Sequence, residues 1–135
     1  SGTLLEDLVK PYVIVRKAGM KIGVIGLLTD IMKVVDKNIA MELQYQEPAD
    51  VVIPLASMLK DEKDCDMVIC LSHLGYKEDK ELASQIKNVD VIVGGHSHTL
   101  LHKKQVVVDS EGEEVVVVQN WKWGLNVGHL TVKAE

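Results

Sequence analysis

The sequence contains no phenylalanine, and aromatic residues make up only 4% of its 135 positions, so a core built on aromatic rings is excluded. The hydrophobic residues, 47% of the chain, are instead rich in valine and isoleucine. These β-branched aliphatic residues suit buried strands better than the interior of a helical bundle. A chain of this length can bury a substantial core, and we expect residues 1–135 to form a single domain.

The chain also lacks an excess of basic residues, and its formal net charge is −5. Nucleic acids present closely spaced phosphates that call for a basic face, so no nucleic-acid partner is expected. An acidic protein can still take an anionic substrate where a metal ion supplies local positive charge. No apolar run approaches the length of about 18 residues that a membrane-spanning helix needs, and no secretion signal is present, so no membrane span is predicted.

Cysteine is scarce, and the two present are Cys65 and Cys70. In an extended chain their Cα atoms would lie roughly 16 Å apart, whereas a disulfide needs less than about 7 Å. We therefore expect two free thiols, with Cys70 acting as a small core residue. A redox or regulatory domain is disfavoured because the chain has no C-x-x-C motif.

A strand–helix–strand unit occupies the middle of the chain. The apolar runs Met67–Leu71 and Val91–Val93 have strand length, and Lys77–Lys87 between them carries apolar residues at helical spacing. Such a unit makes its two strands parallel, with a right-handed connection. The carboxyl ends of the two strands should therefore lie at the same edge of a sheet.

Histidines follow both of these strands. His73 comes after the first strand, and His96 and His98 come after the second, behind the break Gly94-Gly95. The carboxyl edge of an α/β sheet is where sites are built, and imidazole suits Zn²⁺ as well as iron, copper and nickel. A single histidine after a strand is usually only a polar loop residue. Three histidines at matched positions predict a metal site.

The remaining segments complete an α/β pattern. Two pairs of strands are predicted to form hairpins, one helix lies between the first hairpin and the strand–helix–strand unit, and a last strand closes the chain. The expected hairpins are Tyr12–Arg16 with Lys21–Leu28 and Val106–Val108 with Val115–Val118, the helix runs from Glu47 to about Glu62, and the last strand is Asn126–Lys133.

Two further segments allow both a structural and a functional interpretation. Gly23-Val24-Ile25-Gly26 lacks the G-x-G-x-x-G spacing of a nucleotide-binding turn, so we favour small residues against which another element packs. Trp121 and Trp123 could stack on a base, but packing across the edge of the sheet is the more common arrangement, and we expect it here.

The histidine motifs resemble a known family. Leu71-Ser72-His73-Leu74-Gly75 followed by Gly94-Gly95-His96-Ser97-His98-Thr99 looks like the second half of the metallophosphoesterase domain of 5'-nucleotidases. That group includes UDP-sugar hydrolases and 2',3'-cyclic-nucleotide phosphodiesterases. Lys21–Thr29 and the segment from Val118 to Leu130 also match its pattern, and the resemblance runs from about Pro11 to the C-terminus.

The resemblance implies a particular fold, and it implies that the other half of the metallophosphoesterase domain is missing from this chain. It implies an α/β fold with mixed sheets and flanking helices, as half of a four-layer α/β/β/α metallophosphoesterase (calcineurin-like) sandwich. Such a half should expose apolar surface, which would be covered by the missing half or by self-association into a homo-oligomer. The base-binding domain of the family is also missing, so the substrate cannot be specified beyond a nucleotide or other phosphoester.

The resemblance also implies a chemistry. The intact enzyme would hold two divalent metal ions (Zn, Mn, Co or Fe) that activate a water for hydrolysis of nucleotide phosphoesters. His73 and His96 would bind one ion and His98 the other. The Asp-x-His and Asn-His motifs that supply the remaining ligands and the catalytic histidine do not occur in this chain. We therefore expect no catalytic residue here, at most one bound metal, and no activity from this chain alone.

Two expectations stay open at this stage. A periplasmic, extracellular or cell-surface location follows from the resemblance only. A small non-catalytic α/β module with a histidine zinc site is the alternative to a fragment of a hydrolase, and motifs upstream in the full gene would decide between them.

Overall fold

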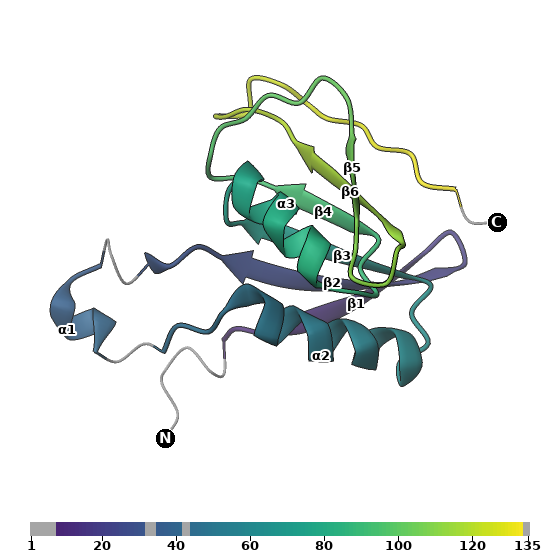
Figure 1. Ribbon diagram of the computed structural model, residues 1–135, viewed down its shortest axis with the longest axis horizontal. Helices are drawn as coiled ribbons and strands as arrows, with labels where there is room; N and C mark the ends of the chain where they lie inside the picture. Colours follow the sequence, from purple (N-terminus) through teal and green to yellow (C-terminus); the bar gives the residue numbers. More distant parts are fainter. Residues whose placement is uncertain (1–7, 32–34, 42–43, 134–135) are drawn as a thin grey trace.

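The computed structural model describes residues 8–31, 35–41 and 44–133. They form one six-stranded mixed sheet in the order β1-β2-β3-β4-β6-β5 (Figure 1). The strands are β1 (Tyr12–Lys17), β2 (Met20–Leu28), β3 (Met67–His73), β4 (Val91–Gly94), β5 (Gln105–Val108) and β6 (Glu114–Gln119), and the helices are α1 (Lys37–Ala40), α2 (Pro48–Asp61) and α3 (Tyr76–Gln85). The predicted α/β fold, a mixed sheet with flanking helices, is confirmed.

The four central strands β2, β3, β4 and β6 run parallel, and the outer strands β1 and β5 run antiparallel to their neighbours. The predicted strand–helix–strand unit is confirmed as β3–α3–β4, with Ile69 paired to Val91. The predicted hairpins are confirmed as well. In the first of them Ala18 and Gly19 both adopt positive φ, which suits the tight turn between two antiparallel strands.

Helices α2 and α3 cover the same face of the sheet (Figure 1). Alternate strand residues point toward them because successive side chains on a strand face opposite ways. The resulting core is aliphatic, and its fully buried members include Ile25, Leu59, Ile86 and Ile92. Cys65 and Cys70 are both buried and free, as expected.

No helix covers the opposite face of the sheet among the described residues. The registers place the alternate residues of all six strands on this face. Many of them are apolar and exposed: Val13, Val15, Leu28, Leu71, Val93, Val106 and Val108. An apolar face of this extent calls for a partner surface.

The predicted last strand is wrong. Residues 126–133 carry no regular secondary structure, and Val127 is 94% exposed. A strand needs a neighbour to take its backbone hydrogen bonds, and within the described part of the chain no strand pairs with this segment. In the described ranges no helix is both long and apolar enough to cross a membrane.

The interpretation of Gly23 as a packing position is confirmed, whereas Gly26 has no such role. A Cβ added at Gly23 would lie 2.8 Å from Cδ1 of Leu59, whereas one added at Gly26 would meet no atom within 4 Å. Leu59 is fully buried in the core, so its side chain has little freedom to withdraw.

We predict that Gly23→Ala lowers the free energy of unfolding by about 1–2 kcal/mol, because the new methyl group overpacks the contact between β2 and α2. The matched variant Gly26→Ala should stay within about 0.5 kcal/mol of the original chain. Urea denaturation followed by circular dichroism measures both values. Equal stability of the two variants would contradict the close contact at Gly23.

Candidate metal centre

The parallel strands all end at one edge of the sheet, which carries the predicted site. β3 ends at His73, β4 ends at Gly94, and β6 ends at Gln119 beside Gly94. The segment that follows β4, residues 95–99, contains His96 and His98, and we call it the histidine loop. Both histidine motifs therefore lie at the same edge, as the strand–helix–strand unit requires.

The rings of His73 and His96 lie against each other. Their centroids are 5.1 Å apart and their planes make an angle of 68°. Gly95 makes the approach feasible, because a Cβ at this residue would lie 3.1 Å from Nδ1 of His73. Two imidazoles that bind one zinc ion through bonds of about 2.1 Å at a tetrahedral angle have ring centres roughly 5 Å apart. The pair therefore fits two ligands of a single divalent ion.

His98 does not join this pair. Its ring lies 6.4 Å from the ring of Trp123, in an edge-to-face arrangement. Within residues 8–31, 35–41 and 44–133, no group of three or more His, Cys, Asp or Glu side chains is arranged to hold a metal ion. The described part of the chain thus offers two adjacent imidazoles, those of His73 and His96. The third imidazole, that of His98, is on the same loop as His96 but lies beside Trp123.

A cleft with a volume of about 810 Å³ borders His96 and carries a strongly acidic lining. Five carboxylates line it, those of Asp30, Glu47, Asp50, Glu78 and Glu81. Their combined field attracts cations toward His96 and repels a free phosphate dianion. The cleft therefore favours binding of a metal cation at this edge and disfavours binding of an anion in the absence of a metal ion.

The turn that follows His73 is held by a buried polar pair that the sequence reasoning missed. The hydroxyl of Ser72 donates to Oδ1 of Asp79 at 2.5 Å and accepts from the backbone N–H of Leu74 at 3.1 Å. Ser72 is 5% exposed and Asp79 is fully buried. The signal in the sequence is an aspartate in the first turn of the helix after the Ser-His motif.

The other oxygen of Asp79 has no hydrogen-bond partner in the described structure and lies against Gly94. Burial raises the pKa of Asp79, the hydrogen bond from Ser72 lowers it, and the charge of Glu78 raises it again, with a net upward shift. Burial, together with the nearby Asp79, also raises the pKa of the Cys70 thiol to about 12. Cys70 is therefore a poor thiolate and behaves as a core residue.

The expectation that both loop tryptophans pack against the sheet is wrong for Trp123, which is 78% exposed. Trp121 is 39% exposed, and both residues adopt positive φ. Lys122 lies between them, with its ammonium 4.1 Å from the ring centre of Trp123. The ring of Trp123 therefore lies beside His98 and Lys122 and outside the core.

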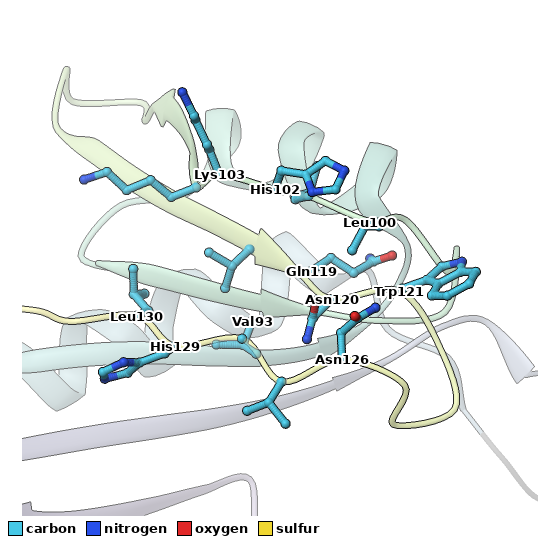
Figure 2. A pocket seen from close by; sticks show the side chains of 16 residues that line it. Val93, Leu100, His102, Lys103, Gln119, Asn120, Trp121, Asn126, His129 and Leu130 are labelled. Atoms are coloured by element: carbon cyan, nitrogen blue, oxygen red, sulfur yellow. The ribbon is translucent and has the colours of Figure 1, made fainter.

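A second cavity, of about 670 Å³, lies between the 100–104 loop and the segment 126–130 (Figure 2). His102 and His129 line it, together with the apolar side chains of Val93 and Leu130. None of the predicted ligands His73, His96 and His98 belongs to its lining. This cavity is therefore separate from the histidine pair.

The raised pKa of Asp79 gives a prediction on pH and stability. The native state holds this proton more tightly than the unfolded chain does, so the stabilisation is full below the ordinary carboxyl pKa of 3.8 and is lost as the pH rises through the raised value. Asp79→Asn stays neutral and keeps an acceptor for Ser72. Its free energy of unfolding should therefore improve relative to the original chain as the pH increases from 4 to 8. Denaturation curves at several pH values measure the difference, and a constant difference would contradict the shift.

Comparison with known proteins gives relatives of one kind, although no family model matches the chain. The trifunctional nucleotide phosphoesterase protein YfkN of Bacillus subtilis (strain 168) is 30% identical over 98% of this chain and 9% of its own length. A snake venom 5'-nucleotidase of Crotalus adamanteus is 29% identical over 95% of this chain and 24% of its own length. The chain thus spans about a quarter or less of the length of these relatives.

The fold leads to the same group. The crystal structure of a 5'-nucleotidase precursor from Thermus thermophilus matches 89% of this chain with a TM-score of 0.74 and 34% sequence identity, and the match covers 26% of that structure. The match in fold extends over nearly the same part of the chain as the similarity in sequence. By sequence and by fold, the chain is similar to one part of 5'-nucleotidases and of a related nucleotide phosphoesterase.

Proposed function

We propose that this chain is the second half of the metallophosphoesterase domain of a 5'-nucleotidase-type hydrolase, and that it supplies His73, His96 and His98 to a site for divalent metal ions. The observation that carries the proposal is the His73–His96 pair. The imidazole rings of His73, at the end of β3, and of His96, in the loop after β4, lie with their centroids 5.1 Å apart at the carboxyl edge of the sheet. The acidic cleft beside His96 supports a cationic occupant.

Each residue has a distinct part in this proposal. His73 and His96 would bind one ion together, since the centroids of their rings lie 5.1 Å apart. His98 would bind a second ion, because its ring lies apart from the pair and beside Trp123. The bound ions would orient a phosphate group and lower the pKa of a coordinated water. The remaining ligands and the catalytic groups would come from the half of the domain that this chain does not contain.

The uncovered face of the sheet supports the assignment to half a domain. Helices lie on one face only among the described residues, and the other presents exposed aliphatic side chains from all along the sheet, including Val15, Leu71 and Val106. A second sheet packed on this face would bury them and would complete a four-layer α/β/β/α sandwich. Pairing of two copies of this chain is the other way to cover the same surface.

The substrate of the complete protein would be a nucleotide or a related phosphoester, in keeping with the names of the relatives. We infer a periplasmic, extracellular or cell-surface location for it, a proposal supported by the relative from snake venom.

Calorimetric titration with Zn²⁺ tests the histidine pair in the chain as it is. We expect one zinc ion to bind, and we expect His73→Ala and His96→Ala each to lower the affinity by more than about 100-fold, because loss of a direct ligand exceeds the 10- to 100-fold effect typical of outer-shell changes. His129→Ala is the matched control, since His129 is exposed and lines the separate cavity. Unchanged affinity in both ligand variants would remove the proposed site.

We also expect no detectable hydrolysis of AMP by this chain with Zn²⁺, Mn²⁺ or Co²⁺, because the missing ligands leave the site incomplete. Phosphate release measured by a colorimetric assay provides the readout. Hydrolysis that copurifies with the chain and disappears in His73→Ala would show that the site is complete as it stands. Zinc binding by a chain whose full-length gene lacks an Asp-x-His and a Gly-Asn-His would instead favour a non-catalytic zinc module.

A further inference from the structure

We propose that Gln119 is a positioning residue that holds the histidine loop in the conformation in which His96 faces His73. The proposal rests on the metal site proposed above, but it concerns a residue outside the set of ligands. Gln119 is the last residue of β6 and lies beside Gly94, the last residue of β4. Gln119 is therefore held in the sheet at the point where the histidine loop begins.

The amide of Gln119 hydrogen-bonds the loop at three points. Its Oε1 accepts from the backbone N–H of Thr99 and, at 3.0 Å, from the hydroxyl of Ser97. Its Nε2 donates to the carbonyl of Gly95 at 2.9 Å. Gln119 is only 3% exposed, so these bonds form where water does not compete strongly for them. One side chain thus spans the loop from its first residue to its last.

The loop needs such support because its backbone is strained. His96 has φ 71° and His98 has φ 53°, a region that residues with a Cβ rarely adopt. A residue in this region persists only where its surroundings over-determine its conformation. Within the loop, one short backbone bond runs from the N–H of Ser97 to the carbonyl of Gly95. A second backbone bond, from the N–H of Trp121 to the carbonyl of Thr99, holds only the last residue of the loop. The contacts from Gln119 hold Gly95 and Ser97, the residues on either side of His96.

Ser97 extends this constraint to the other histidine. Its hydroxyl donates to Gln119, so it accepts from both the backbone N–H of Tyr76 at 3.0 Å and the hydroxyl of Thr99 at 2.9 Å. Tyr76 begins α3, and the turn between β3 and α3 follows His73 directly. The Tyr76–Ser97 bond therefore ties the histidine loop to the segment that follows His73, and the Ser97–Gln119 bond orients the hydroxyl that accepts it.

Glutamine meets the chemical requirement at this position. The loop offers an O–H and an N–H that need an acceptor and a carbonyl that needs a donor, and a primary amide provides both. Leucine has a similar size but provides neither. A carboxylate at this position could accept the two donors but could not donate to Gly95.

The proposal is tested in the full chain with Gln119→Leu, Gln119→Glu and the control Val117→Ala. Val117 is fully buried on the same face of β6, so its truncation weakens the core without touching the loop. Two readouts are used: amide hydrogen exchange by NMR in the metal-free protein, and calorimetric titration with Zn²⁺. The first readout does not depend on a metal site.

We expect Gln119→Leu to speed exchange of the Thr99 amide at least tenfold more than exchange of the core amides, and to lower zinc affinity about 10- to 100-fold, as outer-shell changes do. Gln119→Glu should show a smaller loss, because it retains the acceptor. Val117→Ala should speed exchange across the whole core and leave zinc affinity within about twofold, which is the pattern that a purely structural role for Gln119 would also produce.

If Gln119→Leu folds, exchanges its Thr99 amide at the wild-type rate and binds zinc with the wild-type affinity, the proposal is wrong. If that variant does not fold, Gln119→Glu decides by the same two measurements, since it preserves size and one set of hydrogen bonds. If His73→Ala and His96→Ala leave zinc binding unchanged, the metal site itself is wrong, and Thr99 exchange still shows whether Gln119 holds the loop. The two failures are therefore distinguishable.

Discussion

The parallel register of β3 and β4 is the constraint on which the candidate site depends. Leu71 pairs with Val93, so the same register carried two residues further sets His73 opposite Gly95. Because Gly95 has no side chain, the ring of His73 can lie against the backbone there and reach the ring of the next residue, His96. A shift of one residue would turn His73 to the helix-covered face and separate the two rings. The metal-binding proposal is thus a consequence of strand pairing.

Beneath this edge the chain buries polar groups where the rest of the core is aliphatic. Asp79 and Gln119 both approach Gly94 from the side covered by the helices. Asp79 accepts from Ser72, the residue before His73, and Gln119 donates to Gly95 in the histidine loop. Such groups stabilise less than apolar side chains would, and one oxygen of Asp79 has no partner in the described structure. These contacts cost local stability, but they fix the orientation of the segments that carry His73 and His96. A pair of metal ligands requires such fixed positions.

The two faces of the sheet differ in that one is covered by helices of this chain and the other is left uncovered in the described structure. On one face α2 and α3 enclose an aliphatic core that includes two buried free thiols. On the other face, valines and leucines of the strands remain exposed. The segment 126–133, which the sequence predicts as a strand, has no neighbouring strand to pair with in the described structure. Both features are in keeping with a chain that spans about a quarter of the length of its relatives.

Local residue patterns predicted the strand–helix–strand unit, both hairpins, helix α2 to within one residue of its start at Pro48, and the three histidines at one edge, because hydrophobic periodicity and glycine breaks are local signals. Only the tertiary structure decided that His73 pairs with His96 while His98 faces Trp123, that Trp123 is exposed, and that residues 126–133 form no strand. It also revealed the contacts of Asp79 and Gln119, which join segments 7 and up to 24 residues apart. Such outcomes depend on which backbone segments become neighbours in space, and no local pattern of residues encodes that.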